Sequence, residues 1–139
     1  MVSALELRTL AIARLEEATA LYTKGYYEGT YYLGGYAIEF ALKAVICKLL
    51  KVELFETGVV SGNVLKAFQT HDLSDLTALA GLKPELQALI QVNHSLNKAW
   101  SKVSQWTEPR RYDFGCTSQT AKLFLNSVKI VLRWIEQHW

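Results

Sequence analysis

Residues 26–50 read YYEGTYYLGGYAIEFALKAVICKLL, a tyrosine- and glycine-rich entry followed by an almost wholly apolar segment. From Thr30 onward its only charges before Lys48 are Glu39 and Lys43, which stand four residues apart and therefore share one helix face. A helix that is apolar on all sides must be surrounded by other helices. The stretch thus predicts a helical bundle whose most buried element lies between Tyr31 and Leu50.

The whole chain has the size and composition of one globular domain. It has 139 residues, 50% hydrophobic and 20% charged, and we expect residues 3–139 to form a single domain. The formal net charge of +2 is too small to indicate nucleic-acid binding by itself. Cys47 and Cys116 fit no metal spacing, so we expect no metal and no cofactor. The charges at Glu39 and Lys43 argue against a membrane span, and without a disulfide framework or signal peptide the expected location is the cytoplasm.

Capping signals and apolar periodicity place further helices on both sides of the central one. Ser3, with Glu6 three residues later, is a typical helix start. The predicted helices are a long one from Ser3 to Gly25, the central one to about Val52, a short one from Thr70 or Asp72 to Gly81, a long one from Pro84 to Val103 and a long one from Thr117 or Ser118 onward. Residues 54–69 and 104–116 are predicted to be irregular. The fold class is therefore all-α, an antiparallel up-and-down bundle of four long helices plus a short one.

The last predicted helix carries two apolar lines. One of them, through Phe124 and Val128, suffices for the core of the bundle. The second line, through Leu123, Ile130 and Trp134, is not needed for the core and would be exposed. An exposed apolar patch commonly marks an interface. We therefore expect a homodimer built on this second line.

Five short motifs, in this order, resemble the HEPN domain family over nearly the whole chain. They are the small-residue turn that ends the first helix, Tyr36-x-x-Glu39-x-x-x-Lys43, His71-Asp72-Leu73, Leu96-Asn97 and Arg111-Tyr112. Many relatives have a proline after the Arg-Tyr pair, where this chain has Asp113, and the segment between residues 100 and 111 is longer than usual. The resemblance implies a helical bundle, frequent homodimerisation, and work in nucleotide or RNA biology. It also implies a small nucleotidyltransferase as partner, in a toxin–antitoxin pair.

The catalytically active branch of that family implies a metal-independent ribonuclease site formed by an arginine and a histidine. Arg133 and His138 match the spacing, but Trp134 stands where a polar residue is usual. Side chains five residues apart on a straight helix diverge by about 140°. This segment therefore has two interpretations: a ribonuclease site formed by Arg133 and His138, or a terminal helix whose charged side chains are solvated.

A basic and aromatic cluster is the strongest sequence candidate for ligand contact. Lys98 and Lys102 share a helix face, Arg110, Arg111 and Tyr112 follow in the next loop, and Trp100 and Trp106 lie nearby. Cations suit phosphates and flat rings suit bases, which is what a nucleotide or a single strand requires. The alternative is a solvated face beside a loop that Trp106 anchors.

Two further polar features have a structural and a functional interpretation. Glu39 and Lys43 are expected to form a structural, semi-buried pair, with a functional charge in a bundle groove as the alternative. His71 is either a capping and packing residue or an acid–base group. Three function classes therefore stay open: a HEPN-type module that binds a nucleotide or RNA, the ribonuclease toxin, and a purely structural interaction domain.

Overall fold

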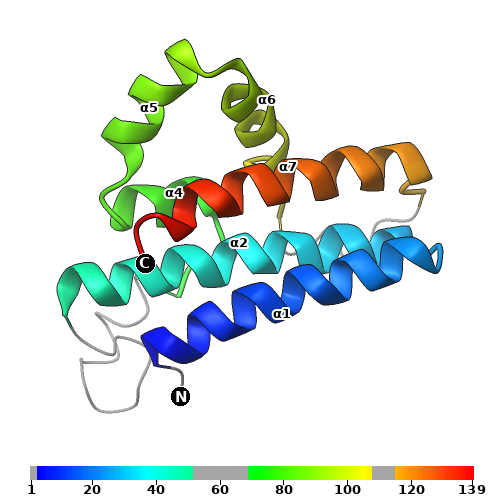
Figure 1. Ribbon diagram of the computed structural model, residues 1–139, viewed down its shortest axis with the longest axis horizontal. Coiled ribbons are helices and arrows are strands. Elements are labelled where there is room, and N and C mark those ends of the chain that lie inside the picture. The colour runs from blue at the N-terminus through cyan, green and yellow to red at the C-terminus, as the bar shows by residue number, and fades with distance from the viewer. Residues whose placement is uncertain (1–2, 52–68, 108–114) are drawn as a thin grey trace.

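The predicted all-α fold is confirmed by the computed structural model, which describes residues 3–51, 69–107 and 115–139. These ranges hold six helices and no strand. Labelled as in Figure 1, they are α1 (Ala4–Thr23), α2 (Tyr27–Leu50), α4 (Leu73–Leu79), α5 (Lys83–Val92), α6 (His94–Val103) and α7 (Ser118–Glu136).

The three long helices α1, α2 and α7 lie side by side, while α5 and α6 form an arch on the outer side of α7 (Figure 1), and α6 packs on α7. Tyr31, near the start of α2, stacks on Phe124, near the start of α7, with ring centroids 4.1 Å apart. Near the other ends of these helices, Lys48 donates a 2.6 Å hydrogen bond to the carbonyl of Trp139. The helices α2 and α7 therefore run in the same direction.

The first helix begins where the sequence predicts. The Ser3 hydroxyl accepts a hydrogen bond from the Glu6 backbone N–H, and the Glu6 carboxylate accepts one from the Ser3 backbone N–H. This reciprocal capping satisfies two backbone donors that a helix start leaves unpaired. Gly25, with φ of +85°, takes the left-handed conformation that lets the chain reverse into α2. The helices α1 and α2 are therefore antiparallel neighbours.

The helix α2 is the centre of the molecule, as its sequence predicts. Ile38, Leu42 and Ile46 are completely buried. Two glycines let neighbours approach its backbone: a Cβ on Gly34 would lie 3.0 Å from the Phe124 ring, and one on Gly35 would lie 1.9 Å from the Trp106 indole. The paired glycines thus allow α7 and Trp106 to pack closely on the backbone of α2.

The predicted long helix from Pro84 to Val103 is wrong in one respect, because the structure divides it at Asn93. That residue has φ −113° and ψ 96°, outside the helical region, and its side-chain carbonyl accepts a 3.0 Å hydrogen bond from the Leu96 N–H. It ends α5 and caps α6, a role that asparagine performs well. The bundle therefore has three long and three short helices among the described residues, rather than four and one.

The second apolar line of α7 is only partly exposed, which corrects the predicted dimer surface. Trp134 is 6% exposed and belongs to the core, and Ile130 is half-buried. Leu123 is 40% exposed. Because α5 and α6 fold over this side of α7, most of the line is used within the chain. The homodimer stays a prediction, without Trp134 as part of its surface.

No helix of the described ranges is long and apolar enough to cross a membrane. Residues 1–2, 52–68 and 108–114 lie outside the described part of the chain, and with them Arg110, Arg111 and Tyr112 of the predicted cluster.

Candidate functional site

A groove runs between α6 and α7, and we call it the α6–α7 groove. It consists of three adjoining hollows of 590, 340 and 170 Å³. The 590 Å³ hollow lies in the middle. It shares Ser95 and Ile130 with the 340 Å³ hollow, and it shares Lys102 and Leu123 with the 170 Å³ hollow. The start of α6 faces the end of α7 along it, so the two helices are antiparallel. The three hollows therefore follow one another along α7.

The groove is positively charged. Lys98 and Lys102 line its middle, and Arg133 lines the end near Gln137. None of the described residues that line the three hollows is acidic. The two helices together carry five lysines and arginines and a single carboxylate, that of Glu136. A cleft of one charge sign concentrates ligands of the opposite sign.

The rest of the lining combines hydrogen-bonding groups with an apolar floor. The large apolar residues that line the middle hollow are Leu123 and Ile130, and we call them the floor. Uncharged polar side chains surround it: Asn93, Ser95, Asn97, Ser101, Asn126, Ser127 and Gln137. Aromatic rings stand at both ends, Tyr31 and Phe124 at one and Trp134 at the other. All three rings are buried, so they shape the groove from beneath. Amides and hydroxyls can bond phosphate oxygens, whereas the partly exposed Leu123 and Ile130 suit flat apolar surfaces.

The predicted ligand-binding lysines are brought together in this groove, as their spacing requires. Arg133, which the sequence offered as half of a ribonuclease pair, lines the same groove. His138 takes another position: its Nε2 lies 2.8 Å from the Glu85 carboxylate of α5, close enough for an ion pair but without hydrogen-bond alignment. The His138 ring also packs edge-on against Trp134, with centroids 5.8 Å apart. The ribonuclease pair stays a prediction.

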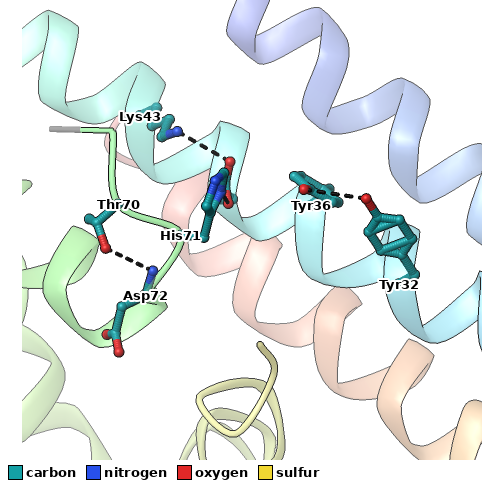
Figure 2. A network of polar contacts seen from close by, with 7 residues as sticks. Tyr32, Tyr36, Lys43, Thr70, His71 and Asp72 are labelled. Atoms are coloured by element: carbon teal, nitrogen blue, oxygen red, sulfur yellow. Dashed lines mark hydrogen bonds and ion pairs between the residues drawn. The ribbon is translucent and has the colours of Figure 1, made fainter. Parts of the chain in front are cut away.

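A second polar site is buried between α2 and the segment before α4. Glu39 is 1% exposed, and its Oε2 lies 3.2 Å from Lys43 Nζ. Its Oε1 lies 2.7 Å from His71 Nδ1. Figure 2 shows His71, in the segment before α4, reaching the face of α2 that carries Lys43 and Tyr36. The predicted Glu39–Lys43 pair is present, and together with His71 it forms a cluster of three side chains.

Aromatic rings surround this cluster. Tyr36 meets the His71 ring edge-on at 6.2 Å and the Trp106 ring at 5.2 Å, and its hydroxyl lies 3.4 Å from that of Tyr32. The N-cap of α4 is Asp72 rather than His71, because the Asp72 carboxylate accepts a hydrogen bond from the Asp75 N–H. His71 therefore connects α4 to α2 through a carboxylate. The side chain of His71 is 43% exposed, so solvent reaches one part of this otherwise buried cluster.

The part of the chain that the structure describes contains no group of three or more His, Cys, Asp and Glu side chains able to hold a metal ion. Two groove residues, Asn126 and Ser127, were not predicted from the sequence, and Asn97 was predicted only as part of a motif. Their positions follow from the packing of α6 on α7, and the available signal was the near absence of acidic residues in both helices.

Comparison with known proteins adds no further constraint: no family model, no curated protein and no solved structure matches this chain.

Proposed function

We propose that the protein is a HEPN-type module that binds a phosphate-containing ligand, a nucleotide or RNA, in the α6–α7 groove. The observation that carries this proposal is the groove's composition: Lys98, Lys102 and Arg133 among neutral donors, with no described acidic residue in the lining. Charge-assisted hydrogen bonds from such side chains are the strong contacts that phosphates accept.

The HEPN part of the proposal is supported by contacts between the motifs that resemble the family. Glu39 and Lys43 belong to one motif and His71 to another, and the three side chains meet in one cluster. Asn97, from a third motif, lines the groove. Two of the motifs therefore hold the segment before α4 against α2, and the third places Asn97 of α6 in the groove.

The test is ligand binding measured by fluorescence anisotropy with labelled ATP and a labelled RNA oligonucleotide. Binding should weaken as salt rises, because each phosphate contact releases counterions. Changing Lys98 and Lys102 together to Ala should weaken binding about tenfold or more. Lys24→Ala is the matched control, since Lys24 is an exposed cation at the end of α1. Equal binding by parent and double variant would place the site elsewhere.

A ribonuclease toxin is the second candidate, favoured by the position of Arg133 in the groove. A phosphodiester bound along α7 would reach its guanidinium, which grips phosphate in a fixed fork. Purified protein should then degrade RNA without added metal, and Arg133→Ala and His138→Ala should each abolish that activity. Degradation that survives both changes would remove this candidate.

The homodimer and the nucleotidyltransferase partner belong to the same proposal. Light scattering at high protein concentration tests the first. Co-purification with a small nucleotidyltransferase encoded beside this chain tests the second. If the protein is a monomer and no such enzyme co-purifies with it, the result favours a module that acts alone through its groove.

A further inference from the structure

We infer that the ligand of the α6–α7 groove is an extended single-stranded polynucleotide rather than a free nucleotide. The inference rests on the proposed function and deepens it, because it names the class of ligand. The geometry that points to it is the length of the groove and the distribution of cations along it.

The groove is longer than one nucleotide needs. Its lining on α7 extends from Thr120 to Gln137, which corresponds to about 25 Å at the rise of an α-helix. Lys102 contributes to the hollow near Thr120, and Arg133 to the hollow near Gln137. One nucleotide would therefore leave one end of the groove unused, whereas a strand of about four nucleotides, the short end of known single-strand site sizes, would occupy all three hollows.

Cations follow the groove along its length. Lys122, Asn126, Lys129 and Arg133 are separated by four, three and four residues, so they lie on one face of α7. Asn126 and Arg133 line the hollows, and Lys122 and Lys129, exposed on the same face, flank the groove without lining a hollow. Lys98 and Lys102 form the opposite wall. A repeating phosphate backbone matches such a row better than one compact phosphate group does.

The floor distinguishes a single strand from a duplex. Leu123, which is 40% exposed, lines the middle hollow together with Ile130. A duplex presents phosphates and sugars outward and keeps its base faces stacked inside, so it cannot use an apolar floor. A single strand can place base faces on it while its phosphates meet the basic walls. The contacts on offer are to phosphates and base faces, so binding should depend little on base sequence.

The experiment is a length series of labelled oligouridines, from the mononucleotide to about eight nucleotides, measured by fluorescence anisotropy on the full chain. Affinity should rise at least tenfold between the mononucleotide and about four nucleotides, and only slightly beyond that length. At the longer lengths the logarithm of the affinity should fall with the logarithm of salt with a slope of roughly −2 to −3, the value for three or four neutralised phosphates. A matched oligodeoxythymidine series tests the DNA form of the same strand chemistry, and binding of either series supports the inference.

Two variants at opposite ends of the groove test its continuous use. Lys102→Ala and Arg133→Ala should each weaken the binding of the long oligonucleotide several-fold, while Lys24→Ala on α1 should not. Thermal melting of each variant shows that it is folded. If the mononucleotide binds as tightly as the octamer, or if only one end matters, the proposed function survives and this inference is wrong. A duplex that binds as tightly as the single strand also overturns it. If no phosphate compound binds, both proposals fail.

Discussion

Nδ1 of His71 lies 2.7 Å from Oε1 of Glu39, so a side chain in the segment before α4 meets a carboxylate buried in α2. The same carboxylate holds Lys43 through its other oxygen. A buried carboxylate keeps its charge only where partners replace its lost hydration. The cluster therefore fixes α4 against α2 at one place, with a geometry that an apolar contact would not specify.

Removing the carboxylate should destabilise the protein strongly. Glu39→Ala leaves the Lys43 ammonium, with a side chain only 10% exposed, without its Glu39 partner, and breaking such a pair from one side costs about 3–5 kcal/mol. Replacing Glu39 and Lys43 together by Leu should recover most of that loss, because no lysine is then left in the apolar surroundings. Urea denaturation measures both. Equal destabilisation by the single and double variants would show that the Glu39–Lys43 interaction is not the source.

The sequence predicted the elements whose signals are local. The capping box at Ser3 and Glu6, the turn at Gly25 and the all-apolar surface of α2 depend on neighbouring residues, and the structure has all three. The interruption at Asn93 also had a local signal, a polar residue on an apolar stripe. Hydrophobic periodicity outweighed it, because the stripe continues on both sides with nearly the same phase.

Features that depend on packing were harder to predict. In the sequence of α7 alone, Trp134 appears on an apolar line that the core does not need. In the structure α5 and α6 cover this side of α7, which the sequence of α7 does not indicate. The α6–α7 groove has the same origin: Lys98 and Lys102 could be paired by their spacing, whereas Asn126 and Arg133 join them only once α6 lies antiparallel on α7. Predicting contacts between distant segments requires knowing in which direction the helices pack on one another, and hydrophobic periodicity does not give that direction.

Gly35→Ala should destabilise the protein by about 1–3 kcal/mol, the cost of overpacking a well-filled core. The added Cβ would lie 1.9 Å from the indole of Trp106, a rigid ring that is 1% exposed. Gly29→Ala is the matched control in the same helix, where the nearest atom is the flexible tip of Leu21 at 3.0 Å. There the gain in helix propensity, about 0.5–1 kcal/mol, should offset the crowding. Thermal melting that ranks the two variants in the opposite order would contradict the close contact at Gly35.

The helix break at Asn93 should be sensitive to the loss of one side-chain oxygen. Asn93→Ala removes the acceptor of the Leu96 N–H and should cost about 0.5–2 kcal/mol. Asn93→Asp keeps an acceptor and should be close to neutral. If Asn93 were instead the interior of one continuous helix, Ala would stabilise the protein, because alanine is the better helix former. The sign of the change in unfolding free energy therefore distinguishes the two.

Glu28 should make stability depend on pH in the acid range. Hydrogen bonds from its own backbone N–H, from that of Gly115 and from that of Cys116 hold the pKa of the Glu28 carboxyl below its ordinary value. The Gly115 bond, 3.2 Å long, ties the chain before α7 to the first turn of α2. In the unfolded chain these bonds are absent and the pKa returns to its ordinary value. Protonation then favours the unfolded state, so the carboxylate's contribution is complete above the ordinary pKa and disappears as the pH falls through the lower folded value.

The parent protein should therefore be more stable than Glu28→Gln at neutral pH, by a small amount because the group is exposed to solvent, and the difference should vanish as the pH falls through the lowered pKa of the folded state. Thermal melting of both proteins over the acid range measures it. Glu16→Gln, which removes an exposed carboxylate from the middle of α1, separates this effect from a general change in surface charge. If the difference between the parent and Glu28→Gln stays constant from neutral to acid pH, or grows as the pH falls, the charged form of Glu28 does not hold the two helix starts together.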